Sequence, residues 1–75
     1  MEYTLKDAPL NKNLIIKQIK YANELLGIRL ANFGFIKGEK IEVLSRPTKH
    51  ICLVCLRDVV YALDKTQCEQ VVVYD

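Results

Sequence analysis

The sequence predicts a mainly β domain: a small barrel of about five strands, with one amphipathic helix inserted between the first and second strands and a short helical turn before the last strand. Three observations indicate this class. The chain has 75 residues, which is enough for one small domain, 1–75. Short apolar runs rich in β-branched residues recur along it, separated by turn-forming residues. Only one segment, beginning at Asn23, has apolar residues at helical spacing.

The first predicted strand covers residues 14–20, where β-branched residues dominate. Apolar residues on both faces of this segment suit a strand with a bulge or bend. A helical period follows, in which Leu25 and Ile28 widen an apolar stripe formed by Leu26, Leu30 and Phe33. Asn23 can cap the start of this helix, and Gly34 can end it. We expect the stripe to be core and to pack across one opening of the barrel.

The second predicted strand, residues 39–45, shows clean alternation of apolar and polar side chains. Ile41 and Val43 should point inward, while Lys40 and Glu42 point to solvent. Gly38 precedes this strand and is expected to form the turn into it, because glycine tolerates backbone conformations that other residues avoid.

Two more strands are expected after a turn at residues 47–48, where Pro47 interrupts the pattern. The run 51–56 is apolar on both faces and reads as a buried strand. A tight reversal at Arg57 and Asp58 then leads into the strand 59–63. Asp58 suits this position because aspartate tolerates positive φ better than most residues.

The last elements are a capped helical turn and a short strand, residues 71–74. Asp64 and Gln67 have the spacing of a capping box, in which each side chain accepts a hydrogen bond from the other residue's backbone N–H. A short helical turn over 64–70 is therefore expected. Five short strands with open edges invite aggregation, so we predict a closed or nearly closed SH3-like barrel.

The composition of the chain argues against several classes of function. A net charge of +2 and a pI of about 8.5 fall short of a strong polyanion-binding surface. One histidine, without Ser-His-Asp spacing or a phosphate-cradling glycine loop, offers no basis for an enzyme. No apolar run is long enough to span a bilayer, and the amino terminus lacks the apolar core of a signal peptide. We expect a cytoplasmic protein, with its three cysteines reduced.

The residues that most resemble a metal site are Cys52 and Cys55, with His50 upstream and Cys68 downstream. On a strand, however, residues 52 and 55 point to opposite faces, whereas a C-x-x-C chelate needs a turn. We therefore predict no metal site and no cofactor, with the thiols acting as small apolar residues. His50 and Cys52 share a face, so a weak partial site stays open, although His50 is better explained as a solvated turn residue.

The stretch from Arg29 to Val43 contains the pattern R-L-x-x-apolar-G-apolar-x-x-G, and Tyr61-Ala62-Leu63 precedes the capped turn. With these residues the chain resembles the FeoA family, small cytoplasmic accessory proteins of bacterial ferrous iron transport, over nearly its whole length. Family members commonly have glycine in the hairpin where this chain has Asp58. The resemblance implies an SH3-like fold, no enzyme activity, and regulatory contact with FeoB, the membrane permease whose cytoplasmic part binds guanine nucleotide.

A docking surface for that partner is expected beside the buried helical stripe. Leu25, Arg29, Phe35 and Lys37 combine apolar side chains with two cations, which suits an acidic or amphipathic segment. The alternative is that Leu25 and Phe35 only seal the end of the barrel. We expect membrane association only through the permease, and we predict neither nucleic-acid binding nor a homo-oligomer.

Two other binding functions stay open as alternatives. A generic SH3-like peptide binder would need an exposed aromatic shelf, and this chain has no tryptophan and only scattered tyrosines. An RNA-binding barrel is favoured by several lysines in the first half of the chain, but these lysines also suit an ordinary solvated surface.

Overall fold

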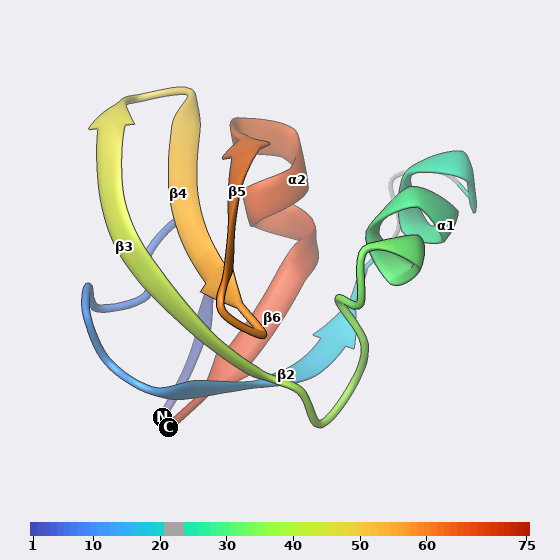
Figure 1. Ribbon diagram of the computed structural model, residues 1–75, viewed down its shortest axis with the longest axis horizontal. Coiled ribbons are helices and arrows are strands. Elements are labelled where there is room, and N and C mark those ends of the chain that lie inside the picture. Colours follow the sequence, from blue (N-terminus) through green and yellow to red (C-terminus); the bar gives the residue numbers. More distant parts are fainter. Residues whose placement is uncertain (21–23) are drawn as a thin grey trace.

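The computed structural model describes the backbone of residues 1–20 and 24–75, and the side chains outside residues 21–27. Six strands in this part form one antiparallel sheet with the order β1-β6-β2-β3-β4-β5. The sheet curves around a single core, and the two chain ends lie together where β1 pairs with β6 (Figure 1). The architecture is the mainly β, SH3-like fold that the sequence predicts.

The elements have the predicted order, with one addition at the start. They are β1 (Glu2–Thr4), β2 (Leu14–Ile19), α1 (Glu24–Asn32), β3 (Lys40–Thr48), β4 (Ile51–Leu56), β5 (Val59–Asp64), α2 (Lys65–Gln70) and β6 (Val71–Tyr74). Strand β1 was not predicted, because it has only three residues and is held by pairing with the distant β6. Within the described residues β1 and β5 are the sheet edges and do not pair, so hydrogen bonds do not close the barrel.

The core follows from strict alternation along the strands. In β4 every second side chain is buried, and in β3 Ile41 and Val43 are buried while Lys40 is exposed. Buried residues from all parts of the barrel meet in one cluster: Leu5, Ala8, Leu14, Ile16, Leu30, Phe35, Ile41, Val43, Cys52, Val54, Leu56, Leu63, Cys68, Val71 and Val73. The predicted inward residues of β3 are therefore confirmed.

The end of β3 differs from the prediction. We expected a turn at Pro47 and Thr48, but the strand continues to Thr48 and the turn lies at Lys49 and His50. The pairing with β4 shifts between Ser45 and Thr48, so Pro47 lies at an irregularity of the ladder. Proline has no N–H to donate to a regular ladder, and an irregularity removes that requirement.

Strand β2 contains a bulge, as its two-sided apolar pattern suggests. Ile16 pairs with Val73 and Gln18 with Val72, which leaves Lys17 as the extra residue. A bulge redirects side chains, and both Lys17 and Gln18 are exposed. Two adjacent polar side chains therefore stand on the outer surface of β2.

Arg46 anchors the segment between β1 and β2, a role that the sequence analysis did not foresee. Its guanidinium Nη2 donates to the backbone oxygens of Leu5 at 2.6 Å and Ala8 at 2.7 Å. Leu5 and Ala8 are themselves buried, so this segment closes one side of the core. The hydrogen bonds supply a charged donor to two backbone carbonyls of this buried segment.

Helix α2 begins with the capping box that the sequence predicts. The backbone N–H of Gln67 donates to Asp64 Oδ1 at 2.8 Å, and the backbone N–H of Asp64 donates to Gln67 Oε1 at 3.0 Å. Cys68 on this helix is buried, which fixes α2 against the barrel. Of the two helices in the described chain, neither has the length and apolar character that crossing a lipid bilayer requires.

Candidate functional site

The end of α1 positions the residues of the candidate site. Gly34 has a φ of +97°, in the left-handed region, and its N–H donates to Ala31 O at 2.9 Å. The N–H of Phe35 reaches back to Leu30 O at 3.0 Å. These two bonds form a Schellman motif, in which the residue after the glycine packs against the third residue from the helix end. Leu30 and Phe35 are accordingly both buried.

This geometry corrects the predicted roles of two phenylalanines. Phe35, expected on the docking surface, is 0% exposed, whereas Phe33, expected in the core stripe, is 53% exposed. The reason is the left-handed turn at Gly34, which directs the following side chain into the barrel. Tyr61 packs against both rings, with centroid distances of 5.6 Å to Phe33 and 5.3 Å to Phe35. Phe35 therefore belongs to the barrel seal, which was the alternative considered for it.

The exposed residues around this turn form the candidate docking surface. Phe33 and Ile36 are 53% and 45% exposed, and Arg29 and Lys37 are also exposed. We call these four residues the α1 exit surface. Figure 1 shows α1 standing to one side of the barrel, next to the loop that leads into β3. The side chain of Leu25 and the residue Asn23 lie outside the described part of the chain. The docking role predicted for Leu25 and the helix-capping role predicted for Asn23 therefore stay predictions.

The β4–β5 hairpin lies beside this surface. Arg57 and Asp58 both have positive φ, 53° and 63°, as the two central residues of a tight hairpin turn require. Arg57 binds the carboxylate of Glu39 through two side-chain hydrogen bonds, and these bonds lower the pKa of Glu39. Arg57 is thus neutralised locally. Across the described residues, Arg29 and Lys37 form no ion pair.

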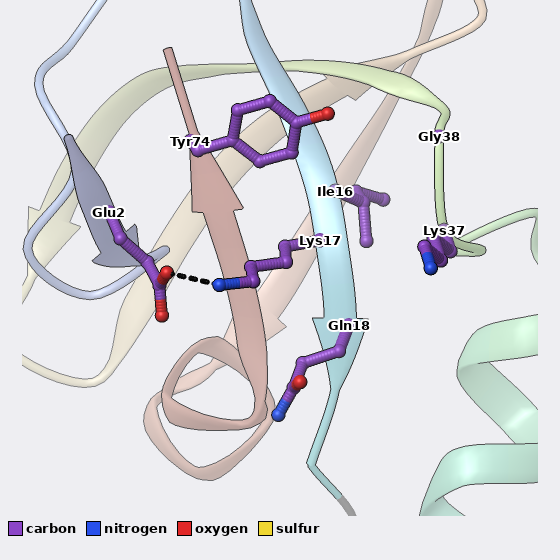
Figure 2. Close-up of a pocket in the computed structure, with 7 residues that line it drawn as sticks. All are labelled: Glu2, Ile16, Lys17, Gln18, Lys37, Gly38 and Tyr74. Atoms are coloured by element: carbon purple, nitrogen blue, oxygen red, sulfur yellow. Dashed lines mark hydrogen bonds and ion pairs between the residues drawn. The ribbon is translucent and has the colours of Figure 1, made fainter.

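A groove with a volume of about 510 Å³ adjoins the α1 exit surface and shares Lys37 with it. Figure 2 shows its lining residues, which come from β1, β2, β6 and the loop before β3: Glu2, Ile16, Lys17, Gln18, Lys37, Gly38 and Tyr74. Gly38 has a φ of +92° and leaves the groove open on that side. Of these residues only Lys37 and Gly38 were singled out from the sequence, because the others come together only through strand pairing.

The cysteines and His50 do not gather into a metal centre in the part of the chain that the structure describes. Cys52 is buried, with its Sγ 3.6 Å from Leu5 O, while Cys55 is half-buried on the opposite face of β4. His50 is exposed in the turn before β4. Burial, together with a hydrogen bond to Cys52, raises the pKa of Cys68, which keeps this thiol protonated and a poor metal ligand.

For the two phenylalanines beside Gly34, a local sequence pattern could have predicted which one is buried. Phe33 and Phe35 flank a helix-ending glycine, and the Schellman pattern alone assigns Phe35 to the core and leaves Phe33 at the cap position. The groove residues Lys17 and Tyr74 had no such signal. Their proximity depends on the pairing of β2 with β6, which are more than fifty residues apart in the chain.

Comparison with known proteins identifies one family. The model of the FeoA domain matches residues 3–75. Among solved structures, the FeoA of Stenotrophomonas maltophilia complexed with zinc, described as a prokaryotic SH3 domain protein, is 28% identical with a TM-score of 0.83, over 96% of this chain and 89% of that one. No curated protein sequence matches at a significant level.

Two further solved structures share the fold. An iron uptake regulatory protein, FeoA, is 23% identical with a TM-score of 0.83, over 97% of this chain and 96% of that one. A manganese-dependent transcriptional repressor is 15% identical with a TM-score of 0.89, and the similarity covers 99% of this chain but 41% of the repressor. The same barrel therefore occurs both as a small protein and as part of a larger one.

Proposed function

The chain belongs to the FeoA family, and from this premise we propose that it is an accessory protein of bacterial ferrous iron transport, which acts by direct contact with the cytoplasmic, guanine-nucleotide-binding domain of an FeoB-type permease. The observation that carries the proposal is the family match over residues 3–75. In this role the protein works in the cytoplasm, at the inner face of the membrane, and reaches the membrane only through the permease.

The α1 exit surface supports contact with a partner protein. Phe33 and Ile36 expose large apolar side chains where the loop leaves α1, and partly exposed aromatic residues are frequent anchors of protein interfaces. Arg29 and Lys37 add positive charge with no intramolecular ion pair among the described residues. Such cations at an interface rim speed encounter with an acidic partner surface. The partner site that fits is an apolar patch edged by carboxylates.

The test is a backbone amide NMR titration of the protein with the isolated cytoplasmic domain of its own permease, in GDP and GTP-analogue states and at two ionic strengths. We expect shifts at residues 29–37. Phe33→Ser should weaken binding by about tenfold or more, as for a partly buried interface aromatic. Its matched control is Leu10→Ser, a residue that is 46% exposed. Leu10 belongs to the segment between β1 and β2, which loops out on the other side of the barrel from α1 (Figure 1).

Three outcomes would overturn the proposal. One is the absence of any shift with both the isolated domain and the full permease in detergent. A second is equal weakening by Phe33→Ser and Leu10→Ser, which would remove the α1 exit surface as the contact. A third is tighter binding to RNA than to the permease domain with a steep dependence on salt, which would favour the RNA-binding alternative.

A further inference from the structure

The groove beside the α1 exit surface has the shape and charge of a peptide site. It crosses the outer side of β1, β6 and β2 and ends at the loop before β3 (Figure 2). On one side the groove is lined by the backbone of Gly38, which has no side chain. Apart from the chain neighbours of Gly38, no described heavy atom lies within 4 Å of the position that a Cβ on this residue would take. The space next to Gly38 is therefore open to a bound chain.

The groove offers each kind of contact that an extended peptide uses. Tyr74 is 41% exposed and presents a ring for an apolar or aromatic side chain. Gln18, which the bulge in β2 directs outward, carries an amide that can donate to and accept from a peptide backbone. Lys17 and Lys37 stand on either side of β2 and supply two separated ammonium groups (Figure 2).

The charge around the groove is unbalanced. The groove lining contains two lysines, Lys17 and Lys37, and one carboxylate, that of Glu2, which binds Lys17 Nζ at 2.6 Å. The hydrogen bond from Lys17 lowers the pKa of Glu2, and the charge of nearby Lys20 lowers it further. Both partners of this ion pair are about half exposed, with side-chain exposures of 49% and 54%. Exposed pairs of this kind are weak, so another carboxylate can replace Glu2 at little cost.

We propose that this groove binds an acidic, extended peptide segment of a partner protein, and that Glu2 on the edge strand β1 occupies the Lys17 end of the site when no partner is bound. One carboxylate of the segment binds Lys37, a second takes the place of Glu2 on Lys17, and an apolar side chain between them contacts Tyr74. The proposal stands apart from the permease contact, since any partner with such a segment satisfies it.

An acidic peptide suits the groove better than a nucleic acid. The groove lining has only two cations, Lys17 and Lys37, one of them paired with Glu2, which falls short of the row of cations that a phosphate backbone uses. The backbone N–H of Gly38 donates to Ile16 O at 2.8 Å and is not free to cradle a phosphate. Two separated cations with an aromatic residue beside them match two separated carboxylates with an apolar side chain nearby.

The test is a fluorescence-anisotropy titration of the full chain with a labelled peptide of alternating glutamate and leucine, compared with the same peptide carrying glutamine for glutamate. We expect the glutamine peptide to bind about tenfold more weakly. Lys37→Glu should weaken the glutamate peptide by about tenfold, because an attractive pair becomes a repulsive one. Lys49→Glu is the matched control at the distant β3–β4 turn and should change the affinity less than about twofold.

The role of Glu2 has its own pair of variants. Glu2→Gln should tighten binding about two- to fivefold, the range expected when a competing exposed ion pair is removed. Glu69→Gln makes the same change of charge on the exposed face of α2 and should leave the affinity unchanged within about twofold. Amide spectra of each variant establish that it is folded, and the bound peptide should shift the signals of Gln18 and Gly38.

Several results would overturn the inference. Equal effects of Lys37→Glu and Lys49→Glu would mean diffuse attraction to a positive protein rather than a site. Equal effects of Glu2→Gln and Glu69→Gln would remove the role of Glu2. Peptide-induced shifts outside the groove, or tighter binding of oligodeoxythymidine than of the glutamate peptide, would assign the groove no peptide function. The permease contact is tested separately, by Phe33→Ser, which lies outside the groove.

Discussion

Truncation of the two phenylalanines on either side of Gly34 should have very different consequences for stability. Phe35 is 0% exposed and is packed with Leu30 at the Schellman motif, whereas Phe33 is 53% exposed and rests on the outer side of Tyr61. The two residues are identical in type and separated by one glycine, so their comparison isolates the effect of burial.

The expected magnitudes follow from these exposures. Truncation of a fully buried phenylalanine to alanine costs about 3–5 kcal/mol, from lost burial and the cavity left behind. Phe33 keeps about half of its surface in water, so its truncation should cost about 1–2 kcal/mol. Domains of this length have unfolding free energies of about 4–11 kcal/mol, so Phe35→Ala removes a large share of the stability and Phe33→Ala a small one.

The assay is urea unfolding followed by far-UV circular dichroism. Because Phe35→Ala can leave too little folded protein for a complete curve, Phe35→Leu serves as a milder variant, with an expected cost of about 1–1.5 kcal/mol. Phe33→Leu should cost less than that. Equal costs for the two alanine variants, or a larger cost at Phe33, would refute the assignment of Phe35 to the core and the Schellman geometry from which it follows.

Three further predictions concern other parts of the barrel. Asp64→Ala should lower stability by about 1 kcal/mol through loss of the α2 cap, seen as a fall in Tm of roughly 4–8 °C, while Thr66→Ala on the exposed side of the same helix should change Tm much less. Arg57 lowers the folded-state pKa of Glu39 below its ordinary 4.5, so its stabilising effect is present above about that pH and is lost as the pH falls through the lowered value. Urea midpoints measured across this range should fall less for Glu39→Gln than for the wild type; identical profiles would contradict the coupling. Among the thiols, half-buried Cys55 should react with a disulfide reagent before buried Cys68, and mass spectrometry after partial labelling would show the opposite order if this reasoning were wrong.

The elements that the sequence predicts correctly are those with a local signal. The capping box of Asp64 and Gln67 is visible because its two partners are three residues apart. The tight hairpin at Arg57 and Asp58 is similarly local, since two turn residues separate two apolar runs. The alternation around Ile41 likewise reports burial directly, because side chains on a strand alternate between the two faces.

The errors have physical reasons of two kinds. The helix end at Gly34 was predicted correctly, but the apolar stripe was extended to Phe33 at the cap position, and the left-handed glycine then directs Phe35 rather than Phe33 into the core. At Pro47 the absence of an N–H indicated a turn, but an irregularity in the β3–β4 pairing accommodates the residue inside the strand. In both places a local rule was valid and a second structural feature decided the outcome.

The sequence by itself determines the order of the strands after β1, the caps and turns between them, and the FeoA family, because each depends on residues close together in the chain or on a continuous match. Three features are visible only in the tertiary structure: the set of residues that lines the groove, the pairing of β1 with β6, and the anchoring of residues 5–8 by Arg46. Those features join segments from distant parts of the chain, and no pattern within one segment specifies its distant partner. The ion pair of Glu2 with Lys17 exists only because strand pairing brings β1, β6 and β2 side by side.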